Sequence, residues 1–318
     1  MKALSKASYQ TPRTARGRNV PLIPYIGRHL TAIGTHYRNH KQFSTRSLYN
    51  FAIARQVPNS FVQSLSSYAD VTDPIDLDLA KSQHVTYVAH IRSQVPTLEL
   101  PPLEDHPDSV FVEDTAVAIG NKVVITWPGH ESRQGEVASI ANVMHQLGME
   151  LYDMKNMSPK ALCDGGDVLY TGRHLFVGIS SRTNHEGAAV LQHAFQTDKL
   201  PVISVPMDEK DALHLKSVIT HIDETTLLAP TGDIGDKILY ALNPENLGYE
   251  VIRLPDIHSC NVVSLNGMVV ASETKCKESR TLLEKSAKER NMKLQFVNSS
   301  EIAKSDGACT CCSILLSV

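Results

Sequence analysis

The feature that most constrains the fold of this chain is a pattern that recurs at intervals of about 45–55 residues. Five short segments alternate apolar and polar residues and run into a loop, often through proline, and four of the five include β-branched residues. This alternation is typical of β-strands, and a recurrence of about this length indicates a repeat architecture. The five segments are residues 95–102, 149–154, 200–206, 249–255 and 292–298.

Each predicted strand follows a segment with the pattern of an amphipathic helix. Within residues 131–147, Val137, Ile140, Val143 and Met144 form one apolar face at helical spacing. The predicted helices cover residues 76–94, 131–147, 187–197, 236–247 and 278–290.

A pair of short predicted strands joined by a tight turn comes before most of the helices. The Asn266-Gly267 turn is the strongest short hairpin pattern of this kind. The repeating unit is therefore strand, strand, helix, strand. The predicted pairs are residues 117–119 with 123–126, 167–170 with 175–179, and 262–265 with 268–271.

The first unit lacks its opening strand, and the chain ends on a predicted strand, residues 312–318. Pairing these two ends would complete the first unit and close a ring. One unit cannot bury its own faces, so the repeats must pack on one another. We therefore expect a single α/β domain over about residues 48–318, a closed ring of about five repeated units. Two ordinary α/β domains with a chance similarity are the alternative.

Charge is distributed unevenly along the chain. Residues 1–50 carry nine of the 31 Lys and Arg and none of the 34 acids, which leaves a net charge of −12 on the rest. Arg-rich, Ser-rich and acid-free sequence is typical of a mitochondrial transit segment. We therefore predict that residues 1–47 are a basic extension and that the protein is mitochondrial. A disordered tail on a cytoplasmic protein, or an artefact of gene translation, is the alternative.

Composition argues against several classes of protein. The acidic body would repel phosphates, so nucleic-acid binding is not expected. No apolar run has the length that a bilayer requires, so no membrane span is expected. Three of the six cysteines lie within four positions, without the paired spacing and distant histidines of a structural zinc site.

An acidic segment, residues 107–117, interrupts an otherwise strand-like run. On an ideal strand Asp108 and Asp114 would share one face. Two carboxylates on one face repel unless a cation lies between them, and a guanidinium accepts carboxylates in two-point hydrogen bonds. The segment could therefore receive a guanidinium ligand, although an acid turned outward or an ion pair with a protein arginine would also explain it.

Two further places could carry chemistry. Asp164, before Gly165-Gly166, could orient a histidine, or it could be an ordinary turn acceptor. His214 and the cysteines of residues 309–312 form a candidate Cys–His couple, in which a thiolate attacks and a histidine stabilises it. By spacing alone Cys309, Cys311 and Cys312 are equal candidates. A core histidine and small buried cysteines are the alternative.

These segments, in this order, resemble the dimethylarginine dimethylaminohydrolase family over about residues 48–318. The Gly-Gly-Asp string is shared across the wider guanidine-modifying superfamily. The Thr-Cys-Cys-Ser string with Phe-Val-Glu-Asp is specific to this branch. The matching strings are residues 107–114, 131–134, 164–168, 178–184, 213–217 and 306–313.

The resemblance implies a five-bladed α/β propeller, the pentein fold, and a hydrolase of carbon–nitrogen bonds. Its members convert asymmetric dimethylarginine and monomethylarginine to citrulline plus dimethylamine or methylamine, without a cofactor. The resemblance also implies a small-molecule substrate, a monomer or homodimer, and a part in regulating nitric oxide synthesis. Zinc would be an inhibitor bound at Cys311.

The resemblance assigns roles to ten residues. Two positions depart from the family pattern: Cys309 replaces a usual aliphatic residue, and Ser305 stands at a backbone-contact position that can be Val. The implied roles are Cys311 as nucleophile, His214 as general acid and base, Asp164 as its orienter, Asp108, Asp114 and Glu113 at the guanidinium, Arg133 and Arg182 at the α-carboxylate, and Ser305 and Leu65 as further contacts, the latter in a lid near residues 60–66.

Two other functions stay open. Within enzymes the alternative is an arginine deiminase, which acts on unmethylated arginine and releases ammonia. In a different class, the chain could be a catalytically silent binding protein on the same scaffold.

Overall fold

The computed structural model of the chain describes residues 49–66, 73–208 and 210–318. The predicted basic extension, residues 1–47, lies outside this part. Across the described ranges, none of the helices has both the length and the apolar character that crossing a bilayer requires.

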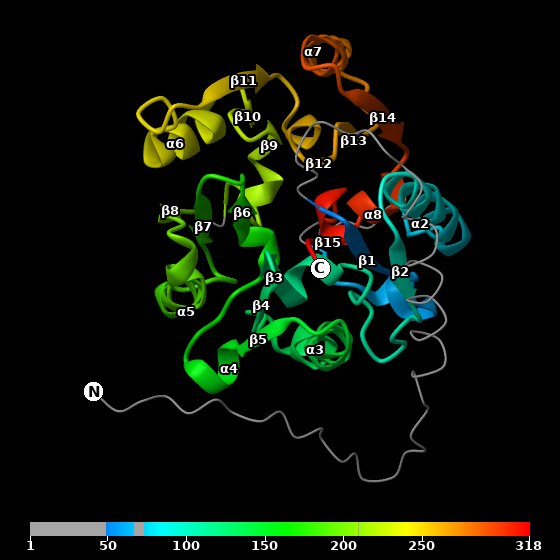
Figure 1. Cartoon of the computed structure of the whole chain (residues 1–318). Coiled ribbons are helices and arrows are strands. Elements are labelled where there is room, and N and C mark those ends of the chain that lie inside the picture. Colours follow the sequence, from blue (N-terminus) through cyan, green and yellow to red (C-terminus); the bar gives the residue numbers. More distant parts are fainter. Residues whose placement is uncertain (1–48, 67–72, 209) are drawn as a thin grey trace, which may run out of the picture. The chain divides into compact units, whose positions relative to one another are not determined.

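Five three-stranded sheets form the domain, and each corresponds to one predicted repeat (Figure 1). The inner strand of each sheet pairs antiparallel with the middle strand, and the middle strand pairs parallel with the outer one. In the order inner, middle, outer, the sheets are β15 (Ile314–Leu316), β1 (Phe51–Arg55), β2 (Thr97–Leu100); β3 (Ala116–Ile119), β4 (Lys122–Ile125), β5 (Glu150–Asp153); β6 (Val168–Tyr170), β7 (Leu175–Ile179), β8 (Val202–Pro206); β9 (Thr220–Asp223), β10 (Thr226–Pro230), β11 (Glu250–Leu254); and β12 (Val262–Leu265), β13 (Met268–Ser272), β14 (Lys293–Val297).

One long helix joins the middle and outer strands of each sheet, as a parallel crossover requires. These helices lie at the periphery of the ring in Figure 1. The helix predicted over residues 131–147 is α-helical only from Val137, because residues Glu131–Glu136 form a 3-10 turn, η4. The helices are α2 (Leu77–Arg92), α3 (Val137–Gln146), α5 (His185–Phe195), α6 (Asp233–Leu242) and α7 (Lys277–Glu289), with short helices α4 (Met154–Met157) and α8 (Ser300–Ala303).

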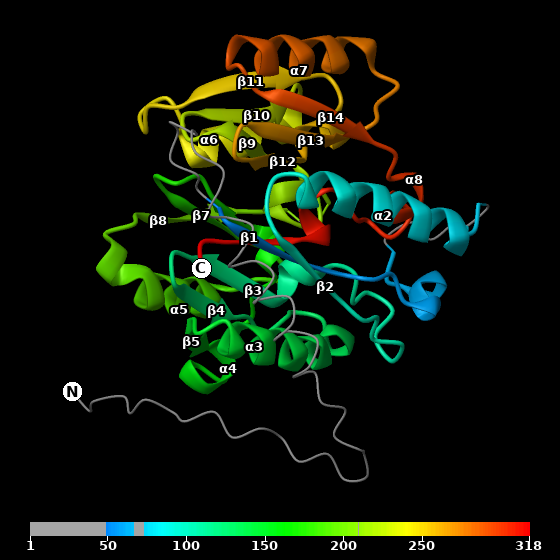
Figure 2. The same cartoon turned by 45° about the vertical axis from the view of Figure 1, so that its right-hand side comes forward.

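The C-terminal strand closes the ring. In four sheets the inner strand directly precedes the middle strand in sequence, but β1 takes its inner partner from the other end of the chain. The red C-terminal segment runs beside β1 in Figure 2. Strand β15, within it, pairs antiparallel with β1, with Phe51 opposite Leu316 and Ile53 opposite Ile314. The predicted closure by the two chain ends is therefore confirmed, as is the five-bladed propeller.

Apolar clusters fill the spaces between neighbouring sheets. Val124 of β4 and Leu175 of β7 belong to one cluster, and Leu169 of β6 and Leu227 of β10 to the next. Each repeat thus buries its apolar face against another repeat, which is why one unit would not be stable alone.

The Asn266-Gly267 turn has the geometry that its sequence predicts. Asn266 has φ 48° and Gly267 has φ 83°, so both lie in the left-handed region. A two-residue hairpin turn needs this twist, and Asn-Gly adopts it at low cost. The turn fixes the register of β12 against β13.

The prediction of a strand through Asp108 and Asp114 is wrong. The amide of Phe111 donates to the carbonyl of Asp108 at 2.9 Å, and residues Val112–Thr115 form a 3-10 turn, η3. Only Ala116–Ile119 is extended, as β3. Hydrogen bonds within these turns pair the buried backbone amides and carbonyls, so the segment does not need a neighbouring strand. The alternation of apolar residues with acids therefore does not produce a strand here.

Candidate active site

A 3-10 turn precedes the inner strand of every sheet in the described part of the chain. The polar residues singled out by sequence lie in these turns or directly before them, and neighbouring turns are in contact around the ring. The candidate residues therefore lie together at the N-terminal ends of the inner strands. The turns are η3 before β3, η5 (Gly165–Asp167) before β6, η7 (Leu215–Ser217) before β9, η8 (Ile257–Cys260) before β12 and η9 (Thr310–Cys312) before β15.

His214 and Asp164 lie directly before η7 and η5, and their side chains meet. The imidazole Nε2 is 2.9 Å from Asp164 Oδ2, and both side chains are buried. The other oxygen, Oδ1, accepts the amide of Gly129 at 2.8 Å, which holds the carboxylate in place. The structure thus brings together the two residues that sequence reasoning paired.

The carboxylates around His214 favour its cationic form. Burial opposes that charge, but the nearby carboxylates, first that of Asp114 and then that of Asp164, outweigh it and raise the pKa of His214 to about 9. An opposite charge at short range stabilises the charged form of a titratable group. His214 therefore carries a proton at neutral pH and is ready to act as an acid.

Asp114 is a buried carboxylate held as an anion. Its Oδ1 accepts the amide of Gly166 at 2.8 Å, and its Oδ2 accepts Nη1 of Arg133. Burial alone would raise the pKa of Asp114, but Arg133 and His214 lower it to about 2. The site thus keeps a fixed negative charge beside His214.

Gly166 allows these groups to approach one another. A Cβ at this position would lie 2.6 Å from Nδ1 of His214 and 2.9 Å from Oδ1 of Asp114. Any side chain there would push the two groups apart, so this position requires glycine for close approach.

Asp167 is a buried residue whose role the sequence reasoning missed. Its Oδ1 accepts the amide of Leu215, next to His214, at 2.9 Å, and its Oδ2 accepts the hydroxyl of Ser180 at 2.7 Å. Ser180 in turn accepts the amide of Arg182 at 3.0 Å. Asp167 therefore ties the His214 segment to the turn that carries Arg182. The sequence signal that could have indicated this role is the position of Asp167, an acid directly before a predicted apolar strand.

The three C-terminal cysteines lie in different surroundings. Cys309 is buried with its thiol 3.2 Å from the hydroxyl of Ser272, and Cys312 is buried with its thiol near the carbonyl of Ala308. Cys311 alone of the three is partly exposed. Its thiol lies in the field of the Glu113 and Asp114 carboxylates. The surroundings thus separate three residues that spacing could not.

The same surroundings keep Cys311 protonated in the free enzyme. Burial, followed by the charges of Glu113 and Asp114, raises the pKa of the Cys311 thiol well above its usual range. A cationic ligand beside these carboxylates would offset that effect.

Asp108, Leu65 and Ser305 lie at a different edge of the site. The amide of Leu65 donates to the carboxylate of Asp108 at 3.1 Å, and the hydroxyl of Ser64 lies 2.5 Å from that of Ser305. The segment that the resemblance describes as a lid consists of the 3-10 turn η2 (Asn59–Gln63) and the residues that follow it. The hydrogen bonds of Ser64 and Leu65 fix the C-terminal end of this segment.

The two predicted carboxylate-binding arginines differ in how they are engaged. Arg133 is buried, binds both oxygens of Glu136 at 2.8 and 3.1 Å, and also binds Asp114. Arg182 is half-buried, with Nη1 at 3.5 Å from Asp164. Arg182 is thus the more accessible cation in this structure.

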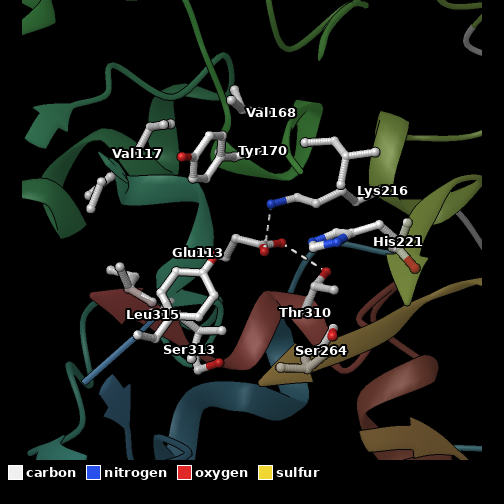
Figure 3. Close-up of a pocket in the computed structure, with 18 of the residues that line it drawn as sticks. Glu113, Val117, Val168, Tyr170, Lys216, His221, Ser264, Thr310, Ser313 and Leu315 are labelled. Atoms are coloured by element: carbon white, nitrogen blue, oxygen red, sulfur yellow. Dashed lines mark hydrogen bonds and ion pairs between the residues drawn. The ribbon is translucent and has the colours of Figure 1, made fainter. Parts of the chain in front are cut away.

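Glu113 faces an axial cavity. Its carboxylate accepts Nζ of Lys216 at 2.6 Å and the hydroxyl of Thr310 at 3.0 Å, as Figure 3 shows. Thr310 also accepts the side-chain amide of Asn261 at 3.0 Å. Sequence reasoning assigned no role to Lys216 or to Asn261, because pairs this far apart in sequence leave no local pattern.

Three possible metal ligands cluster in the described residues. Ligand atoms of Asp114, Asp164 and His214 lie within 4.8 Å of one another, and Cys311 is not part of this group. Asp114 is bound to Arg133, and Asp164 is bound to His214. The inhibitory zinc predicted at Cys311 stays a prediction.

Known proteins resemble the chain in sequence and in structure. The family model of arginine deiminase matches residues 53–240. A dimethylarginine dimethylaminohydrolase of Streptomyces coelicolor is 32% identical over 266 residues, which cover 83% of this chain and 96% of the relative. The dimethylarginine dimethylaminohydrolase of Pseudomonas aeruginosa is 29% identical over 272 residues, which cover 84% of this chain and 99% of the relative.

The solved structures agree with the sequence matches. The Pseudomonas aeruginosa enzyme, as a Cys-to-Ser mutant with citrulline bound, superposes with a TM-score of 0.73 at 27% identity. The match covers 85% of this chain and all of that one.

Fold and relatives together define a propeller hydrolase that acts on carbon–nitrogen bonds of guanidino groups in small molecules. Within this class, the chain belongs to the arginine deiminase family, in the group formed by the dimethylarginine dimethylaminohydrolases.

Proposed function

We propose that this protein hydrolyses N-omega-methylated arginines to citrulline and an alkylamine, with Cys311 as the nucleophile. The observation that carries the proposal is the convergence of Cys311, the His214–Asp164 pair and Asp114 at one end of the ring. The dimethylarginine hydrolases that share 32% and 29% of their residues with the chain support it.

The first half of the reaction forms a covalent adduct. Cys311 Sγ attacks the guanidinium carbon, the bond from that carbon to the methylated nitrogen breaks, and His214 protonates this nitrogen. The amine leaves neutral, and a cationic thiouronium stays on the enzyme. Two steps replace direct attack of water on a resonance-stabilised cation.

The second half releases citrulline. His214, now neutral, takes a proton from water while the water oxygen attacks the same carbon. The bond to Sγ then breaks. Since Asp164 holds Nε2, Nδ1 is the atom that exchanges protons with substrate and water. Gly166 leaves Nδ1 uncovered because it has no side chain.

Substrate charge activates the nucleophile. The free enzyme holds a thiol because burial and two carboxylates raise the pKa of Cys311. A bound guanidinium neutralises Asp114, lowers that pKa and releases the thiol proton to solvent. Attack is thereby confined to cationic substrates.

The two ends of the substrate meet different parts of the site. Asp114 suits the guanidinium because it lies beside His214. We assign Leu65, Ser305 and Arg182 to the amino-acid end, because they border the segment after η2 or are partly exposed. We place Asp108 there as well, rather than at the guanidinium as predicted, since it accepts the amide of Leu65. The predicted role of Arg133 at the α-carboxylate would require it to leave Glu136 and Asp114. The predicted role of Glu113 at the guanidinium would require it to leave Lys216.

Citrulline release from a panel of substrates tests the proposal. Asymmetric dimethylarginine and monomethylarginine should give citrulline, and Cys311→Ser should give none with either. An enzyme that is folded but produces no citrulline from any methylated arginine would contradict the proposal.

A second candidate is an arginine deiminase, which the match to that family model favours. Faster citrulline formation from unmethylated arginine, with release of ammonia, would select it. Location in mitochondria, a monomeric or homodimeric state and a part in nitric oxide regulation stay predictions. Imaging of the tagged full chain and light scattering test the first two.

A further inference from the structure

A cavity of about 120 Å³ lies on the axis of the ring. The inner strands of all five sheets line it, through residues such as Val117 of β3, Tyr170 of β6, His221 of β9, Ser264 of β12 and Leu315 of β15 (Figure 3). A cavity needs about 10–15 Å³ of such volume to hold one water. This one therefore has room for several waters or a small amine.

The floor of the cavity is built from the same turns as the catalytic residues. Glu113 and Thr310 line the cavity, and each directly precedes a candidate site residue, Asp114 and Cys311. Lys216 follows His214 by two residues in the same way. The layer between cavity and reacting atoms is thus a single set of 3-10 turns.

Three side chains close this layer. Glu113 bridges Nζ of Lys216 at 2.6 Å and the hydroxyl of Thr310 at 3.0 Å. The Lys216 and Glu113 side chains are 13% and 12% exposed, so solvent reaches both. Their charges also act on the Cys311 thiol, which places them within electrostatic range of it.

The amino-acid end of a substrate would lie on the other side of Cys311. Asp108 accepts the amide of Leu65, and Ser66 donates its hydroxyl to the carbonyl of Lys304 at 2.9 Å. None of these residues lines the axial cavity. A bound substrate would therefore fill the approach to Cys311 from that side.

The proposed chemistry demands an exchange while that approach is filled. After the first half the citrullyl chain is bonded to Cys311, and a neutral amine must leave. One water must then arrive and give its oxygen to the adduct carbon. One of its protons returns to His214, and the other is taken up by the released amine, so atoms and charge balance.

We propose that the axial cavity, opened by movement of the Glu113–Lys216–Thr310 contact, is the route by which the amine leaves and the hydrolytic water arrives. The inference rests on the proposed function. The lining suits a small alkylamine, since valines and leucines contact methyl groups while Tyr170 offers a hydroxyl.

Filling the cavity tests the route. Ser264→Phe places a ring into the axial space, whereas Ser264→Ala removes the same hydroxyl, which donates to Ile222 O at 2.6 Å, without filling it. With asymmetric dimethylarginine, Ser264→Phe should lower kcat by about tenfold, since steps after adduct formation then limit turnover. Ser264→Ala should match the unmodified enzyme.

The covalent adduct supplies the second measurement. Acid quench and intact mass during turnover should show a larger fraction of Cys311 adduct in Ser264→Phe than in Ser264→Ala. Equal kcat and equal adduct in the two variants, at matched thermal stability, would overturn the route. If Ser264→Phe does not fold, Ala118→Leu fills the cavity from β3 and is read in the same way.

Failure of the route and failure of the proposed function are distinguishable. An unmodified enzyme that makes citrulline alongside cavity-filled variants of equal rate refutes only the route. An unmodified enzyme that makes no citrulline from methylated arginines refutes the function, whatever the variants do.

Discussion

The two faces of the turn layer at the ring axis differ, although they are built from the same segments. One face gathers Asp114, Asp164 and His214 into a network in which buried carboxylates hold a cationic imidazole. The other face carries Glu113 and Lys216, a closed ion pair beside a cavity. The adjacent residues Asp114 and Glu113 thus take different partners: Arg133 and Gly166 bind Asp114, whereas Lys216 and Thr310 bind Glu113. The first face is fitted for proton transfer, and the second borders the axial cavity that we propose as a passage.

The largest expected effect separates Cys311 from its neighbours. Cys311→Ser should lower kcat by about 10⁴-fold or more, the scale of losing a nucleophile. Cys312→Ser is the matched control, because that thiol is buried with its sulfur near the carbonyl of Ala308. Citrulline assays measure both. Activity in Cys311→Ser equal to that of Cys312→Ser would remove Cys311 from the catalytic face.

Removing the imidazole tests the same face. His214→Gly should lower turnover by about 10²–10⁴-fold, the range for loss of a general acid and base. A substrate with a good leaving group should still form the adduct, which would then persist. Intact mass spectrometry detects it, and an absence of adduct would contradict the role of His214 in the second half.

The neighbours Asp114 and Glu113 test the comparison directly. Asp114→Asn should lower kcat/KM by about 10²-fold, since it removes the fixed charge that meets the guanidinium. Glu113→Gln should cost less than about tenfold, because its carboxylate is bound to Lys216 on the cavity face. Steady-state kinetics measure kcat/KM for the two variants. A larger loss in Glu113→Gln than in Asp114→Asn would show that Glu113 is the guanidinium ligand.

Among the residues behind the catalytic face, the smallest expected effect concerns Asp167, a positioning residue. Asp167→Asn should lower kcat by about tenfold through a displaced His214 segment. Burial lowers the pKa of His214, whereas the negative charge of Asp167 raises it. The variant should therefore lower the pKa of His214, and kcat/KM should begin to fall at a lower pH than the value near 9 expected for the unmodified enzyme.

Asp256→Asn is the control for that variant. Asp256 lies directly before η8, in the one repeat without a candidate catalytic residue, and accepts the hydroxyls of Ser259 and Thr274. Both changes should reduce thermal stability, but Asp256→Asn should leave the pH profile in place. An unchanged profile in Asp167→Asn would reduce Asp167 to a structural role.

The sequence alone determined the fold and the kinds of residues in the site. The strand–strand–helix–strand pattern is local, and the missing first strand with the surplus last one predicted the ring closure that β1 and β15 form. The family resemblance paired Asp164 with His214, and the structure brings their side chains to 2.9 Å. The strand predicted from alternation at residues 108–114 was wrong, because hydrogen bonds within turns form there instead of hydrogen bonds to a neighbouring strand.

The tertiary structure alone decided which way each polar residue points. No local rule aims Glu113 at Lys216, which lies 103 residues away, or Arg133 at Glu136 and Asp114 together. These contacts exist only once five repeats close around an axis and bring their turns into one layer. Periodicity is encoded in neighbouring residues, whereas the partner of a buried charge is fixed by the whole ring, because burial leaves no solvent to satisfy it.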